Sequence, residues 1–290
     1  MRPTSMSGKI CIVTGANSGI GKETALGLAQ LGGRVIMVCR NAEKGTAALE
    51  EIRRESGSSQ VDLLIADMSS QASVRALAEQ IQQKYPRVDV LVNNAGGGVP
   101  ARRLSADGIE MTLATNHLGA ALLTFLLLDL LKASAPSRII NVSSSESQRP
   151  KRLDLNDLQF ERRKYRGIAA YAQSKLLMNA FTFELARKLA GTGVTANCLH
   201  PGVVATNIWS ANPPPLIGRL IIAVVKPFML TSKQGAAVSL YLATSPEVAQ
   251  VSGEYFVKSK PAKSNPLSRD PKLMAEVWLC TGKMTSLPLA

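Results

Sequence analysis

The chain has 290 residues, 46% of them hydrophobic, and carries a formal net charge of +13. This length suffices for one large α/β domain with a well-buried core, and the apolar content is ordinary for a globular protein. The positive charge is compatible with a nucleic-acid partner, with attraction to a membrane surface, or with a solvated basic face that favours an anionic cofactor. Because the cations are dispersed and aromatic residues make up 4% of the chain, we expect no nucleic-acid partner.

The cysteine spacing and the N-terminal residues give an expectation of the cellular compartment. The four cysteines show no spacing typical of a metal site, so we expect no bound metal and reduced thiols. Residues 1–8 lack the hydrophobic region of a signal peptide, and no apolar run reaches the length of a transmembrane helix. The expected location is therefore intracellular, either cytoplasmic or peripheral on a membrane.

Short apolar runs alternate with amphipathic segments along the chain. We expect buried strands at residues 10–13, 34–39, 61–66, 88–92, 138–142 and 194–199. We expect helices at 24–29, 43–55, 69–84 with Ser69 or Ser70 as cap, 108–131, 171–189 and 270–282. This alternation predicts one doubly wound, Rossmann-type α/β domain over residues 1–290. Its core is expected at 8–260, and a C-terminal helix and tail at 268–290.

The loop between the first strand and the first helix contains Gly15, Gly19 and Gly21. Such a loop lets the backbone approach a phosphate, and the N-terminus of the following helix offers free N–H groups to an anion. The same loop is also compatible with a tight turn that binds nothing.

Polar residues follow each expected strand, and the carboxyl ends of parallel strands meet at one edge of a sheet, where ligands bind. The clusters are residues 40–41, 67, 93–96, 143–145 and 200–202. Their convergence with the glycine loop favours a nucleotide-binding site over a bare turn.

Five motifs occur in a fixed order: Thr14-Gly15-x-x-x-Gly19-x-Gly21, Asn93-Asn94-Ala95-Gly96, serines at 143–145, Tyr171-x-x-x-Lys175 and Pro201-Gly202. Together they make residues 8–260 resemble the short-chain dehydrogenase/reductase family. Cys39-Arg40, Thr115-Asn116-His117-Leu118-Gly119 and residues 200–204 are similar to its retinol dehydrogenase-type members. The resemblance implies a parallel sheet of about seven strands flanked by helices.

The resemblance also implies four catalytic residues, Asn116, Ser144, Tyr171 and Lys175. Tyr171 and Lys175 share one helix face, so we expect the ammonium to lower the pKa of the phenol, which would act as general acid or base. From the residues alone, a solvated helix face is the preferred interpretation, and the resemblance reverses this preference. Ser144 would orient the substrate oxygen, with Ser143 as its nearest rival. Asn116 would serve a water-mediated proton relay to Lys175, or be a buried structural asparagine.

Arg40 stands at the end of the second strand, where an acidic residue would accept hydrogen bonds from an adenosine ribose. Its guanidinium suits a 2′-phosphate, so we expect NADP(H) rather than NAD(H), although a surface arginine that merely stacks on adenine remains open. The implied cofactor-binding residues are Gly15, Asn17, Ser18, Gly19, Ile20, Gly21, Arg40, Asn41, Asp67, Met68, Asn94, Ala95, Gly96, Tyr171, Lys175, Pro201, Gly202, Val204 and Thr206.

The implied reaction is hydride transfer between a nicotinamide and the carbonyl or alcohol carbon of a lipophilic substrate, such as a retinoid or a sterol. Residues 207–232 are expected to form a lid whose apolar part lines the pocket or touches a membrane, or else to be an ordinary amphipathic helix. Residues 153–158 are expected to shape the substrate mouth. A homodimer is left open. The alternative function is a catalytically silent nucleotide-binding scaffold or sensor.

Overall fold

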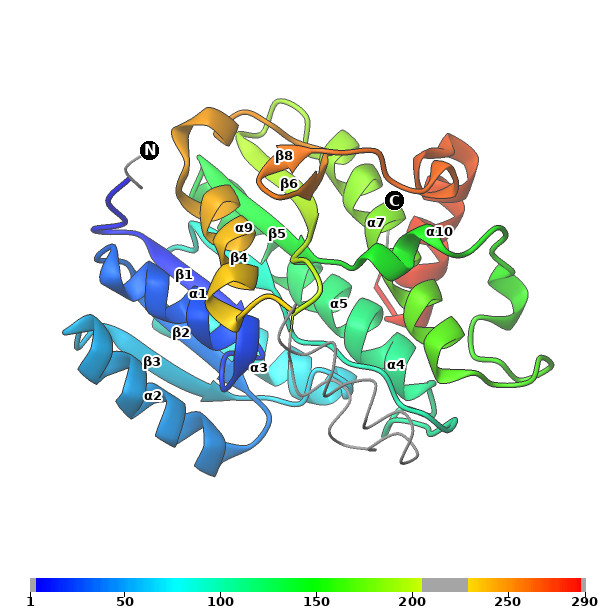
Figure 1. Ribbon diagram of the computed structural model, residues 1–290, viewed down its shortest axis with the longest axis horizontal. Coiled ribbons are helices and arrows are strands. Elements are labelled where there is room, and N and C mark those ends of the chain that lie inside the picture. The colour runs from blue at the N-terminus through cyan, green and yellow to red at the C-terminus, as the bar shows by residue number, and fades with distance from the viewer. Residues whose placement is uncertain (1–3, 205–228, 288–290) are drawn as a thin grey trace.

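The apolar runs expected as strands all enter one sheet of the computed structural model, which describes residues 4–204 and 229–287 (Figure 1). The strand order is β3-β2-β1-β4-β5-β6-β7-β8, with β1 to β7 parallel. The strands are β1 (Ile10–Thr14), β2 (Arg34–Cys39), β3 (Val61–Ile65), β4 (Val90–Asn93), β5 (Ser137–Val142), β6 (Val194–His200), β7 (Tyr255–Val257) and β8 (Lys260–Pro261). This order confirms the predicted doubly wound domain.

The sheet differs from the prediction at its far edge, where it gains an eighth strand. Lys258 and Ser259 both have positive φ, 50° and 60°, and form a two-residue turn that sends β8 back antiparallel to β7. The seven parallel strands agree with the expected parallel sheet of about seven strands, whereas alternating hydrophobicity gives no signal for a strand as short as β8.

Helices cover both faces of the sheet, because successive residues of a strand point to opposite sides. Ile12 packs with α3, α5, α7 and α10 on one face, whereas Cys11 and Val13 pack with α1, α2 and α9 on the other. The helices are α1 (Gly19–Gln30), α2 (Ala42–Ser56), α3 (Gln71–Lys84), α4 (Met111–Leu113), α5 (Gly119–Leu126), α6 (Leu128–Ala133), α7 (Gly167–Lys188), α9 (Ser232–Thr244) and α10 (Pro271–Met284).

Two helix boundaries differ from the sequence-based expectation in ways that affect the site. The stretch expected as one helix at 108–131 starts at Met111, passes through a π-helical turn, η1 (Ala114–Leu118), and is interrupted at Leu127. Helix α7 begins at Gly167, a full turn before the expected start at 171. Of the two serines considered as cap of α3, Ser70 accepts the hydrogen bond from Ser73 N.

The described part of the chain holds no helix long and apolar enough to cross a membrane. Its cysteines are all free thiols, and three of them, Cys11, Cys39 and Cys198, are buried. Trp278 is buried between α10 and α7, where its ring stacks on Phe181 at 5.6 Å between centroids, as expected for a packed C-terminal helix.

Candidate active site

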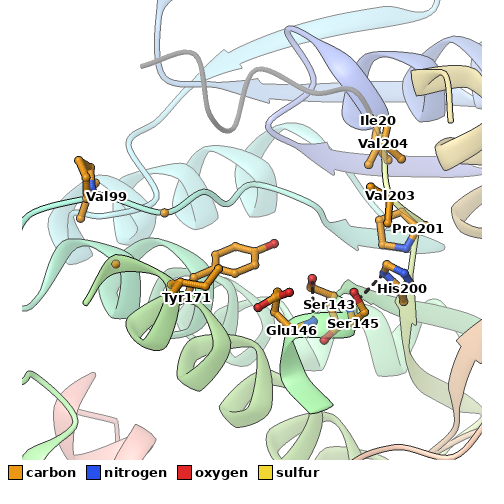
Figure 2. Close-up of a pocket in the computed structure, with 16 residues that line it drawn as sticks. Ile20, Val99, Ser143, Ser145, Glu146, Tyr171, His200, Pro201, Val203 and Val204 are labelled. Carbon is orange, nitrogen blue, oxygen red and sulfur yellow. Dashed lines mark hydrogen bonds between the residues drawn. The ribbon is translucent and has the colours of Figure 1, made fainter. Parts of the chain in front are cut away.

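A cavity of about 430 Å³ opens beside the carboxyl ends of β5 and β6 and the start of α7 (Figure 2). One side carries the serines, Glu146, Tyr171 and His200, and most of the remaining wall is apolar. The lining residues are Ile20, 98–100, 143–146, Gly167, Ile168, Tyr171 and 200–204. The site thus combines a small group of polar side chains with an apolar surround, which is typical of a pocket for a small organic ligand.

Tyr171 lies early in α7, and its side chain lines the cavity together with Ser144. Burial raises the pKa of the Tyr171 phenol, the Ser144 hydroxyl lowers it, and the charge of Glu146 raises it, with a net rise. The expected lowering of this pKa by Lys175 is therefore wrong for this arrangement. Desolvation disfavours the phenolate, and the ammonium nitrogen lies 5.7 Å from the ring centroid.

Ser143 and Ser144, the two serines considered for catalysis, point in different directions. Ser143 is 2% exposed and donates its hydroxyl to the Lys175 carbonyl at 3.4 Å. Ser144 caps the short helix η2 (Ser145–Gln148) by accepting from Glu146 N, and its side chain contacts Tyr171. Ser144 is thus the serine whose hydroxyl could bind a substrate oxygen together with the phenol.

Lys175 is buried one helical turn after Tyr171 and donates to the Val142 carbonyl at 2.8 Å. Burial lowers the pKa of this lysine from 10.5 to about 8. Gly96 passes so close that a Cβ there would lie 3.3 Å from Lys175 Nζ. The nitrogen therefore sits at the floor of the crevice between β4 and β5, where the carboxyl ends of the strands meet.

Asn116 lies in the π-helical turn η1 and is 1% exposed. Its amide donates to Ser174 Oγ at 2.9 Å, and its Oδ1 accepts from Gly97 N at 2.8 Å. These bonds join η1, α7 and the loop after β4, so Asn116 has a structural role that is compatible with the implied relay to Lys175. A π-helical turn at a functional position is common, because it redirects one side chain within a helix.

The glycine loop fits the phosphates of a dinucleotide. Gly15 has φ +67°, and a Cβ there would lie 2.9 Å from Ala95 Cα, so the loop packs backbone to backbone on the turn after β4. Asn94 supports it by donating to the Thr14 carbonyl at 2.8 Å. The first turn of α1 contains no acidic residue, and Ser18 makes no side-chain cap. The N-terminal N–H groups of α1 are thus suited to an anion.

The residues expected at the adenosine end lie along β2 and β3. Arg40 and Asn41 are exposed, and the Asn41 side chain accepts from Lys44 N to cap α2. Asp67 accepts from Ser69 N and Oγ, while the Met68 side chain is buried in the core. Thr206 and most of the expected lid, residues 205–228, lie outside the described residues.

Several residues that line the cavity were not expected from the sequence. Glu146 follows the serines but belongs to none of the motifs, and residues 98–100 and 167–168 also line the cavity. Residues 153–158, expected at the substrate mouth, do not line the cavity. Within that segment, Asp157 is buried and ion-paired with Arg163 at 2.8 Å.

Histidine was not expected to bind metal, and His117 is accounted for by packing. It is 1% exposed, its Nε2 lies 2.8 Å from Thr281 Oγ1, and its ring meets Phe181 edge to face. Among residues 4–204 and 229–287, no group of three His, Cys, Asp or Glu side chains is placed to hold a metal ion.

Comparisons with known proteins decide the family. The family model described as short chain dehydrogenase matches residues 9–154 and 159–215. The chain belongs to the short-chain dehydrogenase family. It is accordingly an oxidoreductase that acts on CH–OH groups. Retinol dehydrogenase 13 of Homo sapiens is 42% identical, over 98% of this chain and 86% of that protein. Retinol dehydrogenase 12 of Homo sapiens is also 42% identical, over 94% of this chain and 85% of that protein.

Solved structures agree with this assignment. An uncharacterized protein from Mycobacterium paratuberculosis superposes with a TM-score of 0.80 at 31% identity, covering 99% of this chain and 97% of that one. A complex of Pseudomonas aeruginosa RhlG with NADP has a TM-score of 0.71 at 26% identity, covering 88% of this short-chain dehydrogenase and 97% of that chain.

Proposed function

We propose that this short-chain dehydrogenase is an NADP(H)-dependent enzyme that interconverts an alcohol and a carbonyl group on a lipophilic substrate. The observation that carries the proposal is that the side chains of Tyr171 and Ser144 line the same largely apolar cavity, together with Ile20 of the first turn of α1. Apolar walls from Ile20, Val99 and Ile168 favour an apolar substrate, and the related retinol dehydrogenases support the same substrate class.

The roles of the chain's own residues follow from their contacts. Ser144 binds and orients the substrate oxygen, and Tyr171 gives a proton to that oxygen in reduction or accepts it in oxidation. Burial keeps the phenol protonated near neutral pH, which favours its role as an acid. The Lys175 ammonium, with a pKa of about 8, returns a proton towards the phenol through the crevice that Asn116 and Gly97 border. When bound, the nicotinamide would supply or accept the hydride.

The cofactor would lie along the carboxyl ends of β1, β2 and β4. The N-terminus of α1 and Gly15 would hold the diphosphate, Asp67 the adenine, and Lys175 the nicotinamide ribose. Arg40 would meet the 2′-phosphate, because it is exposed after β2 and has no ion pair within the described chain. The NADP in the RhlG complex is consistent with this preference.

The function is tested by mixing the purified protein with NADPH and medium-chain aldehydes, ketones or retinal, and following the loss of nicotinamide absorbance. We expect turnover with several of these substrates. Tight NADPH binding measured by calorimetry, together with no turnover of any carbonyl compound and no oxidation of the matching alcohols, would instead establish a silent nucleotide-binding scaffold.

Replacing Arg40 with Ala is expected to raise the KM for NADPH by about 10- to 100-fold, because a charge-assisted contact to phosphate contributes about 1.5–3 kcal/mol. The KM for NADH should stay within about twofold, since NADH carries no 2′-phosphate. Lys44→Ala, which removes a nearby exposed cation from α2, is the control and should change neither value. An equal loss with both cofactors would show that Arg40 stacks on adenine without selecting the phosphate.

A further inference from the structure

Glu146 places a carboxylate inside the substrate cavity, and neither the family motifs nor the proposed mechanism uses it. It lies in the first turn of η2, its side chain is 22% exposed, and it lines the cavity with Tyr171 and Ser144. Figure 2 shows the carboxylate between Tyr171 and Ser143, on the polar side of the cavity. A substrate held by Ser144 and Tyr171 therefore lies next to a negative charge.

One of the two oxygens of the Glu146 carboxylate is available to bind a ligand. Glu146 Oε2 is buried and pairs with Arg149 Nε at 2.7 Å, and the Arg149 side chain is 69% exposed, so solvent screens this pair. Glu146 Oε1 makes no hydrogen bond with any residue in the described ranges 4–204 and 229–287. Its charge acts on the neighbouring phenol, since it raises the pKa of Tyr171. An accessible acceptor oxygen is thus available where a substrate would bind.

Filling the cavity changes the solvation of this oxygen. A plain hydrocarbon chain would displace the water on Glu146 Oε1 and leave a charge without a partner, which is unfavourable. A substrate hydroxyl or amine would replace that water with a charge-assisted hydrogen bond. A substrate carboxylate would be repelled. The apolar lining residues Val99 and Ile168 still favour an apolar body.

Resting on the proposed function, we propose that Glu146 is a specificity-determining residue that receives a hydrogen-bond donor of the substrate. The preferred substrates are then apolar carbonyl compounds that carry a second, donor group near the reacting carbon, namely hydroxy or amino ketones and aldehydes, and the corresponding diols and amino alcohols. Matched compounds without the donor, and keto acids, are poorer substrates of the same site.

The test compares matched pairs of medium-chain ketones and aldehydes, each with and without a hydroxyl or primary amine two to four bonds from the carbonyl. For the wild-type protein, kcat/KM should favour the donor-bearing member of at least one pair by about tenfold or more, the range of a hydrogen bond to a charged group. Glu146→Leu should bring that ratio to about one, chiefly by improving the plain substrate. Glu146→Gln should abolish the amine preference and keep part of the hydroxyl preference, because its amide oxygen still accepts.

Glu276→Gln is the matched control, because it removes the same charge from α10, outside the cavity lining, and its pair with Lys272 is 4.0 Å long. Glu276→Gln should leave every ratio of kcat/KM unchanged.

A second measurement is binding affinity. Calorimetry with a diol and its matched mono-alcohol should show the same preference for the donor-bearing compound, and Glu146→Leu should abolish it. Equal kcat/KM values and equal affinities within every pair would overturn the inference while the proposed enzyme activity stands. Absence of turnover with all carbonyl compounds would overturn the activity, and equal binding would then overturn the role of Glu146 as well.

Discussion

Tyr171→Phe is expected to lower kcat by about 10³-fold, with the Kd for NADPH changed by less than about tenfold. The phenol is the group that can exchange a proton with the substrate oxygen, and a positioned general acid contributes about 10²–10⁴-fold. Phenylalanine keeps the ring and its packing in α7, so the fold should be preserved. Loss of the hydroxyl should cost at most about 1 kcal/mol of stability, the magnitude of one hydrogen bond. Steady-state rates and calorimetric NADPH titrations measure the two effects separately.

Tyr165→Phe is the matched control for this experiment. The Tyr165 hydroxyl bonds Glu110 Oε1 at 2.9 Å and the Val99 carbonyl at 3.2 Å, and the residue does not line the cavity. Its loss should lower the melting temperature and leave kcat within about threefold, because only a buried hydrogen bond is removed. A Tyr171→Phe protein that turned over at the wild-type rate would reject Tyr171 as the acid.

The positions of six strands and the doubly wound class could be predicted because burial on both faces leaves continuous apolar runs, and because polar residues gather where parallel strands end. The runs at residues 34–39 and 138–142 are mostly apolar and become β2 and β5 nearly as expected. By contrast, β8 has two residues and no pattern, and its place depends on the conformation of Lys258 and Ser259. Short edge elements of this kind are set by turn geometry.

The catalytic candidates came from the resemblance to the family, but the environment around them could not be predicted. Sequence predicts that Tyr171 and Lys175 share a helix face, yet it does not predict how deeply each is buried, and burial reverses the expected direction of the pKa of Tyr171. The sequence did not single out Glu146 for a related reason. Its position is fixed by the helix η2 that Ser144 caps, a local structure that no periodicity reveals.

Lys175→Met should lower kcat/KM by at least about 100-fold, because an ammonium fixed near the reacting groups stabilises developing negative charge. The same substitution should have an unusual effect on stability. Burial lowers the pKa of Lys175 from 10.5 to about 8, so holding the charged form in the folded protein costs about 3 kcal/mol at neutral pH. Methionine removes that cost, while the Val142 carbonyl loses its donor.

The sign of the pH dependence follows from proton binding. Between pH 8 and 10.5 the unfolded wild-type chain binds more protons at Lys175 than the folded protein, so wild-type stability rises with pH in this window. Lys175→Met lacks this pH-dependent contribution to the free energy of unfolding. Its stability relative to wild type is therefore greatest below pH 8, and this difference should decline by up to about 3 kcal/mol towards pH 10.5. Urea unfolding at pH 7 and pH 10 measures the difference, and exposed Lys132→Met controls for the change of residue type. A difference that stayed constant with pH, or grew, would show that Lys175 is not a buried ammonium whose charge opposes folding, and its role as a proton donor at neutral pH would lose its physical basis.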